Sequence, residues 1–99
     1  MRVVVKLSGH NFVALINIGS THNFIHPRVA RRVRIKVLNH KPIRVNIVDG
    51  SKLWSEGSCL DIKLMIQGDQ FVTRAYVIKL RGCDMVLGIQ WLKSLGPIL

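Results

Sequence analysis

The segment ALINIGSTHNFI, residues 14–25, decides how this chain is interpreted. A short apolar run leads into the small-residue turn IGS, and an apolar segment, THNFI, which is expected to be extended, leaves it. This layout delivers Asn17 to the end of a strand, where a ligand could meet it. Many proteins use such a turn to present a catalytic carboxylate, whereas this turn presents an amide.

The composition is that of one small globular domain, residues 1–99. Hydrophobic residues make up 48% of the chain and charged residues 20%, which excludes a disordered tail. The longest apolar run, FVALI, has five residues and is far too short to span a membrane. The apolar core of the N-terminus is too short for a secretory signal. We therefore expect an intracellular protein, cytoplasmic or nuclear, with no membrane association.

The cysteines and histidines do not form a metal-binding pattern. Cys59 and Cys83 make no metal framework and are expected to be free thiols of an intracellular protein, with a single disulfide between them as the less favoured alternative. His22 and His26 are four residues apart, as in helical zinc-binding pairs, but Pro27 follows and no third ligand is apparent. We predict neither a metal site nor a cofactor.

Positive charge is concentrated in the first half of the chain. The net charge is +10, and residues 1–48 contain nine Lys or Arg and no acidic residue. The densest part, residues 26–44, suggests either a footprint for nucleic acid or another polyanion, or a solvated basic loop and short helix. No aromatic residue lies between Phe24 and Trp54, so the stacking platform of a single-strand binder is missing. The second interpretation is therefore favoured, and nucleic acid remains a weak alternative partner.

Short β-branched runs separated by turns predict an all-β chain with about seven strands. Hairpins are expected around SGHN (8–11), DGS (49–51) and QGDQ (67–70). Besides THNFI, the expected strands are RVVVKL (2–7), FVALIN (12–17), PIRVNIV (42–48), KLWSEG (52–57), CLDIKLMI (59–66), FVTRAYVIKL (71–80) and MVLG (85–88). PRVARRV (27–33) is expected to form one or two helical turns, and IQWLKSLG (89–96) a helix near the C-terminus.

Two segments together resemble retroviral-type aspartic proteases, especially those of gypsy-type LTR retrotransposons of plants. Residues 14–25 resemble the active-site segment, whose pattern is two apolar residues followed by Asp, Ser or Thr, and Gly. GCDMVLGIQWLKSLGPI (82–98) resembles the distal segment, an apolar-apolar-Gly turn that runs into a C-terminal helix. The NIVDGSKL hairpin (46–53) between them also fits, so the resemblance covers almost the whole chain.

The resemblance implies a closed, retropepsin-like barrel with one short C-terminal helix, which pairs as a symmetric homodimer. Each subunit contributes one Asp at the dimer axis, and an extended peptide or polyprotein segment lies under two mobile hairpins, the flaps. On this resemblance Asn17 stands at the catalytic Asp position, Ile18 at the hydroxyl position and Gly19 at the tight turn. The remaining positions that it assigns are the flap and substrate residues Asp49, Gly50, Ser51 and Trp54, and the distal turn of Val86, Leu87 and Gly88. Trp54 is expected either to touch a peptide or to pack under its hairpin.

The chain departs from the family motif at two positions. Family members hold two carboxylates together so that they share one proton and act as general acid and general base. Asn17 cannot accept a proton, and loss of proton transfer by a positioned group typically costs ~10²–10⁴-fold in rate. Ile18 removes a hydrogen bond to the other subunit, which costs on the order of 1–3 kcal/mol where the partner stays buried. We therefore predict no useful peptidase activity.

Three hypotheses follow for function. The first is a homodimeric pseudoprotease that binds extended peptides. The second is an aspartic endopeptidase captured in an inactivated form, although an experimenter would have changed only the carboxylate, so the change at Ile18 favours natural loss. The third is a basic nucleic-acid-binding domain that uses residues 26–44.

Overall fold

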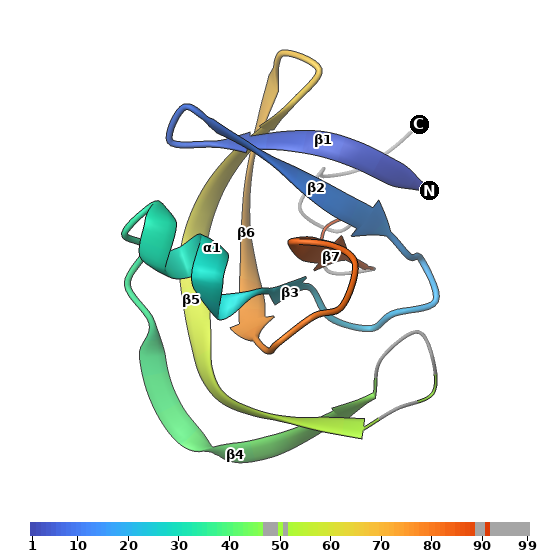
Figure 1. Ribbon diagram of the computed structural model, residues 1–99, viewed down its shortest axis with the longest axis vertical. Helices are drawn as coiled ribbons and strands as arrows, with labels where there is room; N and C mark the ends of the chain where they lie inside the picture. The colour runs from blue at the N-terminus through green and yellow to red at the C-terminus, as the bar shows by residue number, and fades with distance from the viewer. Residues whose placement is uncertain (47–49, 51, 89–90, 92–99) are drawn as a thin grey trace.

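The computed structural model describes residues 1–46, 50, 52–88 and 91, and this part of the chain is mostly strands (Figure 1). It contains β1 (Arg2–Leu7), β2 (His10–Ile16), β3 (Phe24–Ile25), α1 (Pro27–Arg32), β4 (Leu38–Asn46), β5 (Lys52–Ile66), β6 (Asp69–Val77) and β7 (Met85–Leu87). The predicted all-β class is confirmed. Among the described residues, no helix has the length and apolar character needed to cross a membrane.

The strands pair in the order β1-β2-β7-β3-β6-β5-β4. Lys6 of β1 also pairs with Met65 of β5, so β1 pairs with two strands, β2 and β5. The strand β7 runs parallel to β2 and antiparallel to β3, and β3 runs parallel to β6. The two-residue strand β3 is therefore inserted between β6 and β7, two strands that follow each other in the sequence and lie far from β3 in it.

Two tight turns set the register of the hairpins. Ser8 and Gly9 connect β1 to β2 with φ angles of 50° and 81°, and Gln67 and Gly68 connect β5 to β6 with φ angles of 50° and 85°. Positive φ at both central residues is the geometry whose twist matches that of the flanking strands. The predicted four-residue turns are consequently shorter, because the last two residues of each belong to the following strand, as His10 does in its pair with Leu7.

The strand β5 is continuous over 15 residues, although the sequence suggested two separate strands there. Its first half pairs with β4 and its second half with β6, and the ladder with β6 is irregular between Cys59 and Ile62. Asp61 has a φ of 54° within this irregularity. The strand changes direction here, between the part that pairs with β4 and the part that pairs with β6, and Figure 1 shows the curve of β5.

Other predicted boundaries moved or lie outside the described residues. The extended part of THNFI is only Phe24–Ile25, and β4 begins at Leu38 rather than at residue 42. Of the C-terminal helix predicted over residues 89–96, only Trp91 is described.

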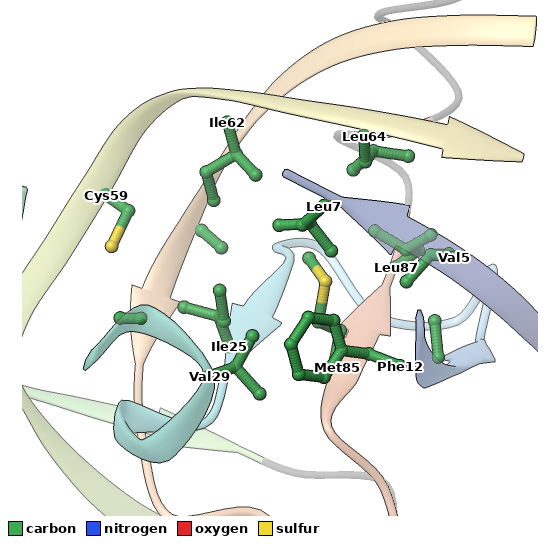
Figure 2. Packing of buried hydrophobic residues seen from close by; sticks show 13 residues of the cluster. Val5, Leu7, Phe12, Ile25, Val29, Cys59, Ile62, Leu64, Met85 and Leu87 are labelled. Carbon is green, nitrogen blue, oxygen red and sulfur yellow. The ribbon is translucent and has the colours of Figure 1, made fainter. Parts of the chain in front are cut away.

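The main hydrophobic core lies where β1, β2, β3, β5, β7 and α1 converge (Figure 2). Ile25 of β3 and Val29 of α1 are both fully buried. Full burial of such side chains stabilises the fold by about 1.5–3 kcal/mol each. The labelled side chains in Figure 2 are Val5, Leu7, Phe12, Ile25, Val29, Cys59, Ile62, Leu64, Met85 and Leu87.

The short helix α1 begins where the sequence indicated. Pro27 occupies its first turn, where the missing N–H costs nothing, and Arg31 and Arg32 lie in the last turn, where positive charge favours the helix dipole. The N-cap is His26, whose Nδ1 accepts the backbone N–H of Arg28 at 3.0 Å. Protonation of Nδ1 would abolish this acceptor.

We expect His26 to make the free energy of unfolding depend on pH. The pKa of His26 lies below its usual value of 6.5, first because burial disfavours the charged ring and then because Arg28 is positive, with Asp84 opposing both. The folded state therefore binds this proton less readily than the unfolded state, and stability falls as the pH drops below 6.5.

Urea denaturation of wild type and His26→Asn between pH 8 and pH 5 tests this expectation. Asn keeps a capping acceptor without titrating, so the pH dependence should be smaller in the variant. His26→Ala should cost about 1 kcal/mol at pH 8 through the lost cap. Identical pH profiles for wild type and His26→Asn would contradict the assignment.

Candidate functional site

The turn that carries Asn17 is attached to β7 by its backbone. The N–H of Asn17 donates to the carbonyl oxygen of Leu87 at 2.9 Å, directly after β2 and β7 end as parallel neighbours. The N–H of Ser20 donates to the carbonyl oxygen of Asn17 at 3.0 Å and closes the turn. Asn17 therefore lies at the end of a strand, as the sequence suggested.

The side chain of Asn17 is oriented by its own turn. Its Oδ1 accepts the N–H of Gly19 at 3.2 Å, which leaves the Nδ2 group as a donor. The next side chain, Ile18, is 70% exposed, and Gly19 is also exposed. The tip of the turn therefore presents an amide and a large apolar side chain to the surroundings, with no titratable group.

A fully buried asparagine connects this turn to the distal segment. Asn23 is 1% exposed, and its Oδ1 accepts the N–H of Gly88 at 2.8 Å. Its Nδ2 donates to Thr73 Oγ1 at 2.7 Å and to the carbonyl oxygen of Arg74 at 2.9 Å. One side chain thus links the Asn17 turn, β6 and the end of β7, and both of its N–H groups and its Oδ1 are hydrogen-bonded.

Gly88 lies directly against the same turn. A Cβ at this position would lie 2.5 Å from the carbonyl oxygen of Ser20 and 2.7 Å from that of His22. Both distances are to backbone atoms, which cannot rotate away as a side chain would. Only glycine allows the two segments to approach this closely. The structure thus brings the Asn17 turn together with Val86, Leu87 and Gly88, the distal positions that the resemblance assigned.

The hairpin of β4 and β5 supplies the predicted flap residues. Gly50 has a φ of 84°, whereas Asp49 and Ser51 lie outside the described residues. Trp54 is 59% exposed, and the guanidinium of its cross-strand neighbour Arg44 lies 5.3 Å from the centre of its ring. Trp54 therefore lies on an exposed face of the hairpin instead of packing beneath it.

The candidate metal ligands do not converge. His26 serves as a helix cap, and the described residues contain no group of three side chains suited to hold a metal ion. Cys59 and Cys83 are free, and burial raises the pKa of both thiols.

Two residues that organise the site, Asn23 and Asp84, were not predicted from the sequence. Asp84 Oδ2 accepts the N–H of Val13 at 2.8 Å, and its Oδ1 pairs with Arg28 at 2.9 Å. Asp84 thereby connects the loop before β7 to β2 and to α1. Neither residue belongs to a hydrophobic period or to a recognised motif, and their partners lie 50 or more residues away in the chain.

Comparison with known proteins identifies the family. A family model described as the PEG10/RTL1 protease domain matches residues 13–99. The chain belongs to this family of retropepsin-like domains. Among solved structures, it is similar to the retroviral protease-like domain of Ddi1 from Leishmania major, with 18% identity and a TM-score of 0.70. That match covers 94% of this chain and 74% of the other, and it shows a shared retropepsin-like fold. No curated protein matches the chain.

We expect Asn23→Asp to destabilise this retropepsin-like domain by about 1–3 kcal/mol, because a buried carboxylate cannot donate to Thr73 or to the carbonyl oxygen of Arg74. Urea denaturation at pH 7 measures the change. Asn11→Asp, at an exposed position of β2, is the matched control and should change stability by less than about 0.5 kcal/mol. Equal decreases in the free energy of unfolding of the two variants would show that the Asn23 side chain does not hold these segments together.

Proposed function

We propose that this chain is a retropepsin-like domain that has lost peptidase activity, forms a homodimer through the Asn17 turn and binds an extended peptide or polyprotein segment. The observation that carries this proposal is the side chain at the tip of the turn. Asn17 keeps a hydrogen bond from the N–H of Gly19, which a carboxylate could also accept, but it cannot take up a proton from water. The position is thus suited to hold the turn and to donate a hydrogen bond, and not to act as a base.

The exposed side chain beside Asn17 supports pairing through this turn. Ile18 is 70% exposed at the tip of the turn. A domain that remained monomeric would gain no stability from a large apolar side chain in solvent. Covering Ile18 against a second subunit would replace the lost hydroxyl contact with apolar burial, worth up to about 1.5–3 kcal/mol per side chain. An apolar neighbour at this place also fits natural loss of the acid chemistry better than deliberate inactivation.

Peptide binding draws on the β4–β5 hairpin. It curves along one side of the molecule in Figure 1, and within the part of the chain that the structure describes β4 pairs only with β5. A strand edge that is free on one side presents backbone donors and acceptors, which is how extended peptides are bound by sheets. The occupant we propose is therefore an extended segment held by main-chain hydrogen bonds.

Restoring the family motif tests the loss of catalysis. Wild type should show no peptide hydrolysis at mildly acidic pH, whereas Asn17→Asp combined with Ile18→Ser should gain turnover of at least ~10²-fold over wild type, because a proton-transfer group returns to a turn that already has the geometry. Ile18→Ser alone is the matched control and should remain inactive. Wild-type hydrolysis at the rate of the double variant would refute the proposal, and an inactive double variant would mean that decay extends beyond the motif.

The dimer should respond weakly to pH between 5 and 8. Two carboxylates at a shared axis repel one another once both ionise, whereas two amides carry no charge at any pH in this range. Sedimentation velocity of wild type and of Asn17→Asp across this range measures the effect. We expect wild type to stay dimeric throughout and the variant to dissociate more as the pH rises. Strong dissociation of wild type at pH 8, or a monomer at every pH, would contradict this expectation.

A further inference from the structure

A hollow beside the Asn17 turn has a chemical character that the proposed function does not use. It lies between residues 22–23, β5 and β6, and we call it the Arg74 hollow. Its rim consists of His22, Ser58, Leu60, Arg74 and Tyr76, while the buried Asn23 and Ala75 complete its lining. Ser58 and Tyr76 are direct cross-strand partners, so the sheet itself places β5 and β6 side chains together here.

Arg74 gives the hollow its charge. Its side chain is exposed, and within the described residues the only ion pair joins Arg28 to Asp84, so Arg74 has no acidic partner there. None of the described residues that line the hollow is acidic. The nearest acidic residues in sequence to Ser58 and Leu60 are Glu56 and Asp61, and both are exposed to solvent. The guanidinium thus retains donors for an external anion.

The walls of the hollow are held in place by aromatic contacts. The ring of Tyr76 packs edge-on against His22, with centroids 5.2 Å apart, and against His40, with centroids 5.9 Å apart. The backbone N–H of Tyr76 donates to the carbonyl oxygen of Asn23 at 3.0 Å. Both N–H groups of the Asn23 side chain are already used in hydrogen bonds within the domain, so the side-chain donors that can reach a ligand come from the other residues that line the hollow.

We propose that the Arg74 hollow binds the carboxylate of a single acidic side chain of an extended peptide. A guanidinium matches a carboxylate with two parallel hydrogen bonds, and His22, Ser58 and Tyr76 add further polar groups around it. This inference rests on the proposed function only in taking the acidic side chain to belong to a bound peptide.

The apolar part of the rim favours an acidic peptide over nucleic acid. Leu60 is 48% exposed at the hollow and can pack against the methylene groups of Glu or Asp. Binding of a phosphate backbone needs several cations in a row, because affinity comes from neutralising successive phosphates. Among the residues whose placement is described, Arg74 is the one Lys or Arg that lines this hollow.

Titration with small probes tests the proposal directly. N-acetyl-glutamate amide and its uncharged match, N-acetyl-glutamine amide, are added to the isotopically labelled protein, and NMR shifts of His22, Arg74 and Tyr76 are followed. We expect shifts from the glutamate probe alone. Arg74→Gln should weaken its binding about tenfold, as expected for loss of a charge-assisted hydrogen bond. The fold should be unchanged, because only the backbone carbonyl of Arg74 is bonded to Asn23.

The matched control is Lys63→Gln, which removes the same charge from an exposed residue of β5 outside the hollow. It should leave the affinity within about twofold of wild type. Equal binding of the glutamine probe, or equal loss in Lys63→Gln, would overturn the proposal. Tighter binding of phosphoserine amide, or of single-stranded DNA to the same residues, would overturn the assignment to a carboxylate.

Separate outcomes distinguish this inference from the proposed function. If the glutamate probe binds at the hollow but no extended peptide binds the domain, the carboxylate site stands and the peptide-binding proposal fails. If extended peptides bind but exchange of Glu for Gln along them never changes their affinity, the proposed function stands and the hollow has no such role.

Discussion

The close approach of Gly88 to the carbonyl oxygens of Ser20 and His22 is the contact on which the site depends. It allows the end of β7 to lie against the Asn17 turn, and the hydrogen bond from the Gly88 N–H to Asn23 Oδ1 keeps it there. The same asparagine holds β6 through Thr73 and Arg74. Three parts of the chain, the Asn17 turn, β6 and the end of β7, are therefore held together by one glycine and one amide side chain, and none of these contacts involves a titratable group.

That arrangement explains how the fold of a retropepsin-like domain can persist with an amide at the tip of the turn. The turn is held by backbone bonds from Asn17 to Leu87 and from Ser20 to Asn17. The side chain of Asn17 contributes only an acceptor for the N–H of Gly19, and Asn and Asp are equivalent in that respect. An amide at this position is therefore compatible with the same local geometry, although it offers no proton-accepting group.

Local sequence patterns predicted most of the strands and the helix α1, whereas long-range contacts determine how the strands pair. Alternation, turn residues and Pro27 identified β1, β2, β6 and α1 closely, because each depends on neighbouring residues. The division of β5 into two strands was wrong, since pairing with both β4 and β6 overrides the local break at residues 57–58. His26 as a helix cap was not foreseen either, because histidine is an uncommon choice there.

The same distinction applies to the site and to its charge. The sequence motifs predicted the Asn17 turn and the distal glycine because they reflect short-range geometry, whereas Asn23 and Asp84 act through partners 50 or more residues away.

The basic segment 26–44 contains no aromatic residue, and this absence argues against binding of single-stranded nucleic acid. Cross-strand pairing nevertheless places Trp54 beside Arg44, so an aromatic neighbour can come from the next strand. One such pair makes a local cation–π contact and not a stacking track, since single-strand binders present several successive aromatic surfaces. Charge in this domain is thus best understood one contact at a time, and a net charge of +10 does not by itself specify a polyanion partner.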